Sequence, residues 1–126
     1  GTARPLFEEE AAMLQMKRGV NGEGVNAQMW FVLGIAYDVY LEVAGKDLTV
    51  TSLRDSHASK PKSLHNKGLA ADLRTKNLAA PHVAAIEKKL KERLEPLGFD
   101  VVNEGDHIHI EYDPKQGEAW LREGVA

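Results

Sequence analysis

The chain has 126 residues, 43% of them hydrophobic and 28% charged, which suits one globular domain over residues 1–126. Its net charge of -3 gives no basic excess to attract phosphate backbones, so nucleic-acid binding is not expected. The chain has no cysteine, which excludes disulfides, thiolate nucleophiles and thiolate zinc ligands.

The first element that the pattern predicts is a short amphipathic helix over residues 6–18. Its apolar stripe contains Phe7, Ala11 and Leu14, and three glutamates fall in its first turn, where the helix dipole favours acids. The glycines of residues 19–24 then predict a loop.

The most apolar run of the chain, residues 27–44, predicts a long helix with Asn26 as its N-cap. Apolar residues follow two of its sides, so we expect the rest of the domain to cover both. Asp38 and Glu42 interrupt the run, and a membrane-spanning helix would carry these charges at high cost. We therefore expect no membrane span. The pattern of the N-terminal residues does not predict a cleavable leader, and the compartment stays open.

The middle of the chain predicts two short strands joined by a polar loop. The β-branched content of residues 48–51 is typical of a strand, and the composition of residues 54–66 is typical of a loop. Residues 69–74 form the second strand candidate. Ala70 and Asp72 should point to one side of it, because side chains alternate along a strand.

The last part of the chain predicts a helix over residues 81–97, begun by a proline, and then two strands. The strands cover residues 99–103 and 107–112, with a hairpin-like turn between them. The fold class is therefore α+β, a small, mostly antiparallel sheet with packed helices. The residues expected to point inward from the helix are Val83, Ile86, Leu90, Leu94 and Leu97.

Four residues in two segments have the chemistry of a zinc site. His65 and Asp72 offer an imidazole nitrogen and a carboxylate oxygen, both of which zinc binds at about 2.0–2.2 Å. His107 and His109 are two residues apart on a predicted strand, so they point to the same side, beside Glu111. Each residue alone would more often be structural. Three of the five histidines fall in these two segments, however, and this favours a metal site.

Residues 63–72 fit, at every fixed position, the SxHxxGxAxD motif of the zinc D-Ala-D-Ala carboxypeptidases. That family includes phage L-alanyl-D-glutamate endopeptidases and shares its fold with the Hedgehog signalling domain. Residues 107–109, His-Ile-His, resemble the HxH motif that carries the family's last zinc ligand. Residues 51–54 resemble its upstream strand, which ends in an arginine. The matched positions are Ser63, His65, Gly68, Ala70 and Asp72.

The resemblance implies that one Zn²⁺ ion is bound by His65, Asp72 and His109. Three protein ligands leave the fourth position open for water, which is typical of catalytic zinc. Arg54 is implied in substrate binding or in stabilising the transition state. Ser63, which has no evident triad partner, is expected to shape the substrate-binding loop rather than to act as a nucleophile.

The general base is left open between two acids. In this family the base is often an acid three residues before the last ligand, which selects Asp106 with His109 and is the pairing that we favour. A shifted register would instead make His107 the ligand and Glu104 the base. If His109 is the ligand, His107 lies beside the metal and is expected to stabilise the developing oxyanion.

The function that the resemblance implies is zinc-dependent hydrolysis of peptidoglycan stem peptides, either as a carboxypeptidase or as an endopeptidase. The expected partner is a cell-wall peptide, and the chain is expected to act as a monomer, either encoded by a phage or located in the periplasm. The alternative is a zinc-containing binding module without activity, or a phage virion component of the same fold.

Overall fold

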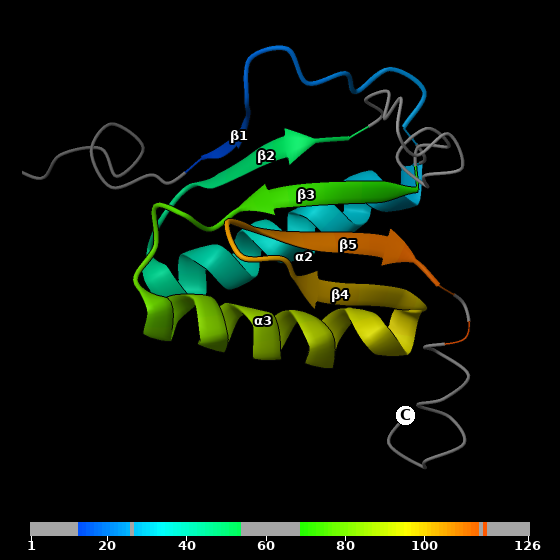
Figure 1. Cartoon of the computed structure of the whole chain (residues 1–126). Helices are drawn as coiled ribbons and strands as arrows, with labels where there is room; N and C mark the ends of the chain where they lie inside the picture. The colour runs from blue at the N-terminus through cyan, green and yellow to red at the C-terminus, as the bar shows by residue number, and fades with distance from the viewer. Residues whose placement is uncertain (1–12, 26, 54–68, 114, 116–126) are drawn as a thin grey trace, which may run out of the picture.

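The computed structural model describes residues 13–25, 27–53, 69–113 and 115, and it shows helices packed on a five-stranded sheet (Figure 1). No helix among these residues is both long and apolar enough to cross a membrane. The elements in chain order are β1 (Leu14–Met16), α2 (Ala27–Ala44), β2 (Leu48–Ser52), β3 (Ala70–Arg74), α3 (Ala80–Leu94), the 3-10 helix η2 (Glu95–Leu97), β4 (Phe99–Asn103) and β5 (His107–Tyr112).

The sheet has the strand order β1-β2-β3-β5-β4, which places β3 and β5 side by side in its middle. The pair β1·β2 is parallel. The other three pairs, β2·β3, β3·β5 and β4·β5, are antiparallel. The α+β class and the mostly antiparallel sheet are therefore confirmed, with one parallel edge strand in addition.

Both long helices cover the same face of the sheet. In Figure 1, α2 passes behind the sheet and α3 runs along its β4 side. Their buried residues join those of the strands in one hydrophobic cluster. The strands contribute alternate residues to this cluster, so the residues between them belong to the opposite face. The clustered residues of the strands are Leu48, Val50, Ala71, Leu73, Phe99, Val101, Ile108 and Ile110.

The helix expected over residues 6–18 is wrong for its described part, because Leu14–Met16 forms strand β1. Its backbone pairs with β2, with Leu14 opposite Leu48, and Asp47 accepts hydrogen bonds from the Met13 amide and the Gln15 side chain. A short helix is marginal in water, whereas the free edge of β2 offers a complete set of backbone partners. Residues 6–12 lie outside the described part of the chain.

The long helix has the predicted bounds, 27–44, but its expected burial on two sides is only partly observed. Trp30 and Leu41 remain 40% exposed, and Phe31 is 66% exposed. Leu33 lies on the same apolar stripe as Trp30 and Leu41 and is fully buried, so this stripe is covered only in part. Asn26, the expected N-cap, lies outside the described residues.

The helix expected to end at residue 97 changes type before that point. After Leu94 the chain tightens into η2, since Pro96 cannot continue an α-helix, and Gly98 closes it at φ 92°. The tighter turn carries Leu97 away from the buried stripe, so this side chain is 52% exposed and its expected inward position is wrong. Ile86, Leu90 and Leu94 are fully buried as predicted.

Candidate metal centre

The centre of the open face is built from β3 and β5, where Asp72 and His109 are direct cross-strand partners. Their neighbours Leu73 and Ile108 are fully buried on the helix side, so alternation turns Asp72 and His109 to the opposite face. The two side chains meet there, and His109 Nδ1 lies 2.7 Å from Asp72 Oδ1.

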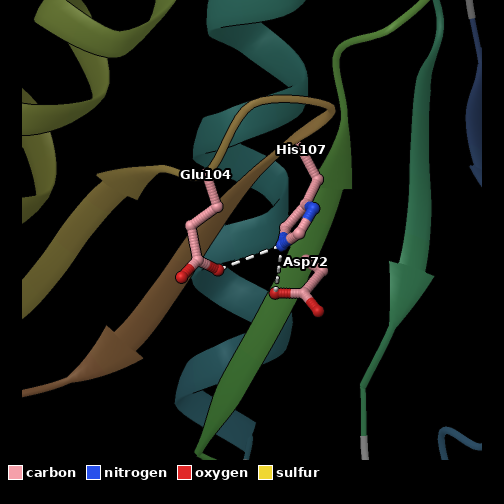
Figure 2. Close-up of side chains that lie close together, drawn as sticks. All are labelled: Asp72, Glu104 and His107. Carbon is pink, nitrogen blue, oxygen red and sulfur yellow. Dashed lines mark hydrogen bonds and ion pairs between the residues drawn. The ribbon is translucent and has the colours of Figure 1, made fainter.

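The turn between β4 and β5 adds Glu104 and His107 to the same place. The Glu104 amide donates to the His107 carbonyl at 2.9 Å and closes the turn. Gly105 adopts φ 102°, which a residue with a side chain rarely does. This geometry sets Glu104 Oε1 3.0 Å from His107 Nε2. Figure 2 shows Glu104, His107 and Asp72 converging from the turn, β5 and β3.

Four potential ligand atoms therefore face one another in a ring. Asp72 Oδ1 lies 2.7 Å from His109 Nδ1 and 3.8 Å from His107 Nε2. Glu104 Oε1 lies 3.0 Å from His107 Nε2 and 4.0 Å from His109 Nδ1. Within this ring, Asp72, Glu104 and His107 offer atoms that all lie within 4.8 Å of one another, close enough to hold a metal ion.

These donors fit a zinc ion. Zinc binds imidazole nitrogen and carboxylate oxygen at about 2.0–2.2 Å, so two ligand atoms of a tetrahedral site lie about 3.3 Å apart. The separations of 2.7, 3.0 and 3.8 Å lie on either side of that value. A mixture of imidazole and carboxylate without sulfur suits zinc among several divalent metals.

The outward nitrogen of each imidazole also meets a carboxylate. His107 Nδ1 lies 2.6 Å from Asp106 Oδ1, and His109 Nε2 lies 2.9 Å from Glu111 Oε1. Each imidazole thus points one nitrogen toward the centre, and its other nitrogen contacts an acid that lies outside the centre. With acids at both nitrogens, the arrangement favours the doubly protonated imidazolium in the metal-free protein.

The acids around the histidines outweigh the effect of burial. Burial lowers the pKa of His109, but the hydrogen bonds and charges of Asp72 and Glu111 together raise it above its ordinary value. Burial also lowers the pKa of His107. The hydrogen bonds and charges of Asp106, Asp72 and Glu104 outweigh this effect, so the pKa of His107 is raised above its ordinary value. The acids around the two rings therefore favour positive charge at this point.

The structure brings together only some of the residues that the sequence selected. Asp72, Glu104, His107 and His109 meet at the centre. Asp106 follows the turn but is 73% exposed, and its side chain contacts the outward nitrogen of His107. The hydrogen bond from His107 lowers the pKa of Asp106. The other three selected residues, His65, Ser63 and Arg54, lie outside the described part of the chain.

A polar cavity of about 250 Å³ adjoins the centre and is lined in part by Asp72 and His107. Three cations also line it, Lys17, Arg74 and Lys76. None of the three is among the site residues expected from the sequence. For Arg74 the alternation of side chains along a strand indicates this position, because Arg74 lies two residues after Asp72 and therefore shares its face of the sheet.

Arg74 is held at the end of β3, beside this cavity. The Tyr40 hydroxyl donates to the Arg74 carbonyl at 2.9 Å, which ties the strand end to α2. Arg74 Nε is buried and has no hydrogen-bond partner among the described residues. A buried donor of this kind favours a ligand that brings an acceptor oxygen.

Comparisons with protein-family models, curated proteins and solved structures give no match to this chain. Two features of the chain therefore bear on its function. One is the motif in residues 63–72, and the other is the geometry of the acids and histidines on β3, β5 and the intervening turn.

Proposed function

We propose that this chain is a zinc-dependent peptidase that hydrolyses peptidoglycan stem peptides, acting on the bacterial cell wall. The observation that carries the proposal is the convergence of Asp72, His109, His107 and Glu104 on one point of the open sheet face. Asp72 belongs to the motif that resembles the zinc carboxypeptidases, and both histidines belong to the HxH segment.

The proposed ligands are His65, Asp72 and His109, where His65 is assigned from the motif alone. Asp72 and His109 suit this choice because they are direct cross-strand partners whose ligand atoms face each other, 2.7 Å apart. When bound, zinc would activate water for attack and polarise the scissile carbonyl. His107 directs Nε2 toward the same space and is suited to donating a hydrogen bond to the oxyanion that develops on the carbonyl oxygen.

Glu104 is the proposed general base, in preference to Asp106. A base must come within hydrogen-bond reach of the water that it deprotonates. Glu104 Oε1 faces both inward ring nitrogens, at 3.0 and 4.0 Å, whereas Asp106 binds the outward nitrogen of His107. Glu104 would accept a proton from the attacking water and deliver it to the departing amine as the C–N bond breaks.

The cavity beside the centre supports an acidic peptide as the substrate. Lys17, Arg74 and Lys76 line it together with Asp72 and Asp106. Asp72 and Asp106 already contact the histidines, so the three cations can interact with a carboxylate of the substrate. The stem peptides that the resemblance implies as substrates carry such carboxylates.

The test is hydrolysis by the zinc-loaded full chain. Purified peptidoglycan and short stem peptides are incubated with the protein, and new amine termini are measured and located by mass spectrometry. The fragment masses distinguish a carboxypeptidase from an endopeptidase. We expect release by the wild type and none by His109→Ala. An absence of new amines at saturating zinc would overturn the proposal.

A second candidate is a zinc-containing module without activity, including a virion component of the same fold. It is favoured by one observation, since Asp72, Glu104 and His107 by themselves offer a set of three ligand atoms. If Glu104 is a ligand, it cannot serve as a free base. Metal analysis of Glu104→Ala separates the two candidates, because zinc is retained if Glu104 is the base and lost if it is a ligand.

A further inference from the structure

We propose that Glu111 is a positioning residue that holds the ring of His109 in the orientation required for metal binding. The proposal rests on the metal site of the proposed function but not on peptidase activity. The proposal is based on the hydrogen bond between His109 Nε2 and Glu111 Oε1, which is 2.9 Å long and lies on the side of the ring away from Asp72.

His109 and Glu111 both lie on β5, an interior strand of the sheet. His109 and Glu111 are two residues apart on β5 and therefore share the open face. β5 is hydrogen-bonded on both edges, with Ala70 and Asp100 opposite Glu111 on its two neighbours. The backbone that carries both side chains thus has little freedom, and the bond between them persists without an ordering cost at metal binding.

The hydrogen bond decides which nitrogen can bind a metal. A neutral imidazole has one N–H and one lone pair, and the acceptor that holds the N–H selects the tautomer. Both ring nitrogens have a carboxylate partner in the metal-free protein. When Asp72 binds the metal, Glu111 accepts the proton on Nε2 and leaves Nδ1 as the nitrogen for the metal. Nδ1 is also the atom that lies 2.7 Å from Asp72 Oδ1, so the selected lone pair points into the centre.

The charge of Glu111 adds to this orientation. A carboxylate behind a ligand histidine makes the metal-binding nitrogen more basic, and removal of such a partner typically weakens metal affinity about 10–100-fold. His109 is only 16% exposed and Glu111 36%, so solvent screens this contact only in part.

Asp106 makes the corresponding bond to His107 and serves as an internal comparison. Its side chain is 73% exposed, and the ring that it holds is not a ligand in the proposed peptidase site. If outer carboxylates act through the ligand that they hold, loss of Asp106 should change zinc affinity far less than loss of Glu111.

The test is zinc affinity of the full chain, measured by competition with a chromogenic chelator. We expect Glu111→Ala to weaken zinc binding about 10–100-fold, and Glu111→Gln to retain part of the affinity because its amide oxygen still accepts the bond. Asp106→Asn and the remote Glu92→Gln are the controls, each expected to change affinity less than threefold, on the order of ordinary surface effects.

A second readout is the tautomer of His109, obtained from ¹⁵N shifts of the imidazole in the zinc-loaded protein. The wild type should carry its proton on Nε2, and Glu111→Ala should lose the hydrogen-bond shift of that nitrogen. Circular dichroism shows whether Glu111→Ala is folded. If it is not, the zinc affinity and the Nε2 shift of Glu111→Gln are compared with those of the wild type instead.

The outcomes separate this proposal from the preceding one. If the wild type binds zinc without hydrolysing peptides, the proposed peptidase activity is overturned. The role of Glu111 is then decided by the zinc affinities of the wild type and the two Glu111 variants. Unchanged affinity and unchanged Nε2 shift in both Glu111 variants would overturn the positioning role alone. A wild type that binds no zinc would overturn both.

Discussion

Asp72 and His109 stand directly opposite each other on adjacent antiparallel strands, with 2.7 Å between Oδ1 and Nδ1. Two potential ligands are therefore in place before any metal arrives. Because β3 and β5 are both interior strands of the sheet, this part of the site should not need to fold around the ion. Metal binding would mainly replace a proton between these atoms.

The role of each histidine can be separated by metal analysis. We expect Asp72→Ala and His109→Ala to lose bound zinc, because each removes a proposed ligand. His107→Ala should keep the ion and lose rate instead. Zinc retained in His109→Ala and lost in His107→Ala would reverse the assignment of the two histidines.

The two candidate bases should differ in their effect on rate. Glu104→Gln is expected to lower kcat about 10²–10⁴-fold, the usual contribution of a general base, with zinc retained. Asp106→Asn should lower kcat less than about tenfold, because Asp106 acts only through the outward nitrogen of His107. Peptide hydrolysis at saturating substrate measures both. Equal losses in the two variants would contradict the assignment of Glu104.

In the metal-free protein, the pKa values of His107 and His109 should lie above that of an ordinary histidine, despite the opposing effect of burial. The folded state then binds the proton more tightly than the unfolded state. These histidines therefore stabilise the fold fully below the unfolded pKa, and this contribution is lost as pH rises through the folded pKa. NMR titration of the ring protons, in the presence of a chelator, measures the values. Midpoints at or below the ordinary value would contradict the structure.

The cation-lined cavity predicts a charge dependence of substrate binding. Lys17→Gln combined with Lys76→Gln should raise KM for an acidic peptide about threefold to tenfold, since each exposed charge contributes modestly. The kcat value should change little, because neither lysine is placed at the reacting atoms. Lys88→Gln, an exposed lysine of α3, is the matched control. Loss of kcat with unchanged KM would argue against binding in this cavity.

Much of the local structure followed from the sequence because it depends on short-range effects. The apolar period of residues 27–44 and the proline in the first turn of residues 80–94 determine two helices, and glycines follow α2 and the 3-10 helix after α3. Alternation along residues 107–112 was enough to place His107 and His109 on one face. The residue types for a metal site were therefore evident before any fold was known.

Only the tertiary structure decided which acid meets which imidazole. Asp72 finds His109 through a strand register that no local pattern contains, and Glu104 turns inward while Asp106 turns outward because Gly105 bends the intervening turn. The same reason explains β1, where pairing with a distant strand outweighed a short helical pattern. Helix and strand preferences act between near neighbours in the chain, whereas a site of this kind depends on contacts between residues more than thirty positions apart.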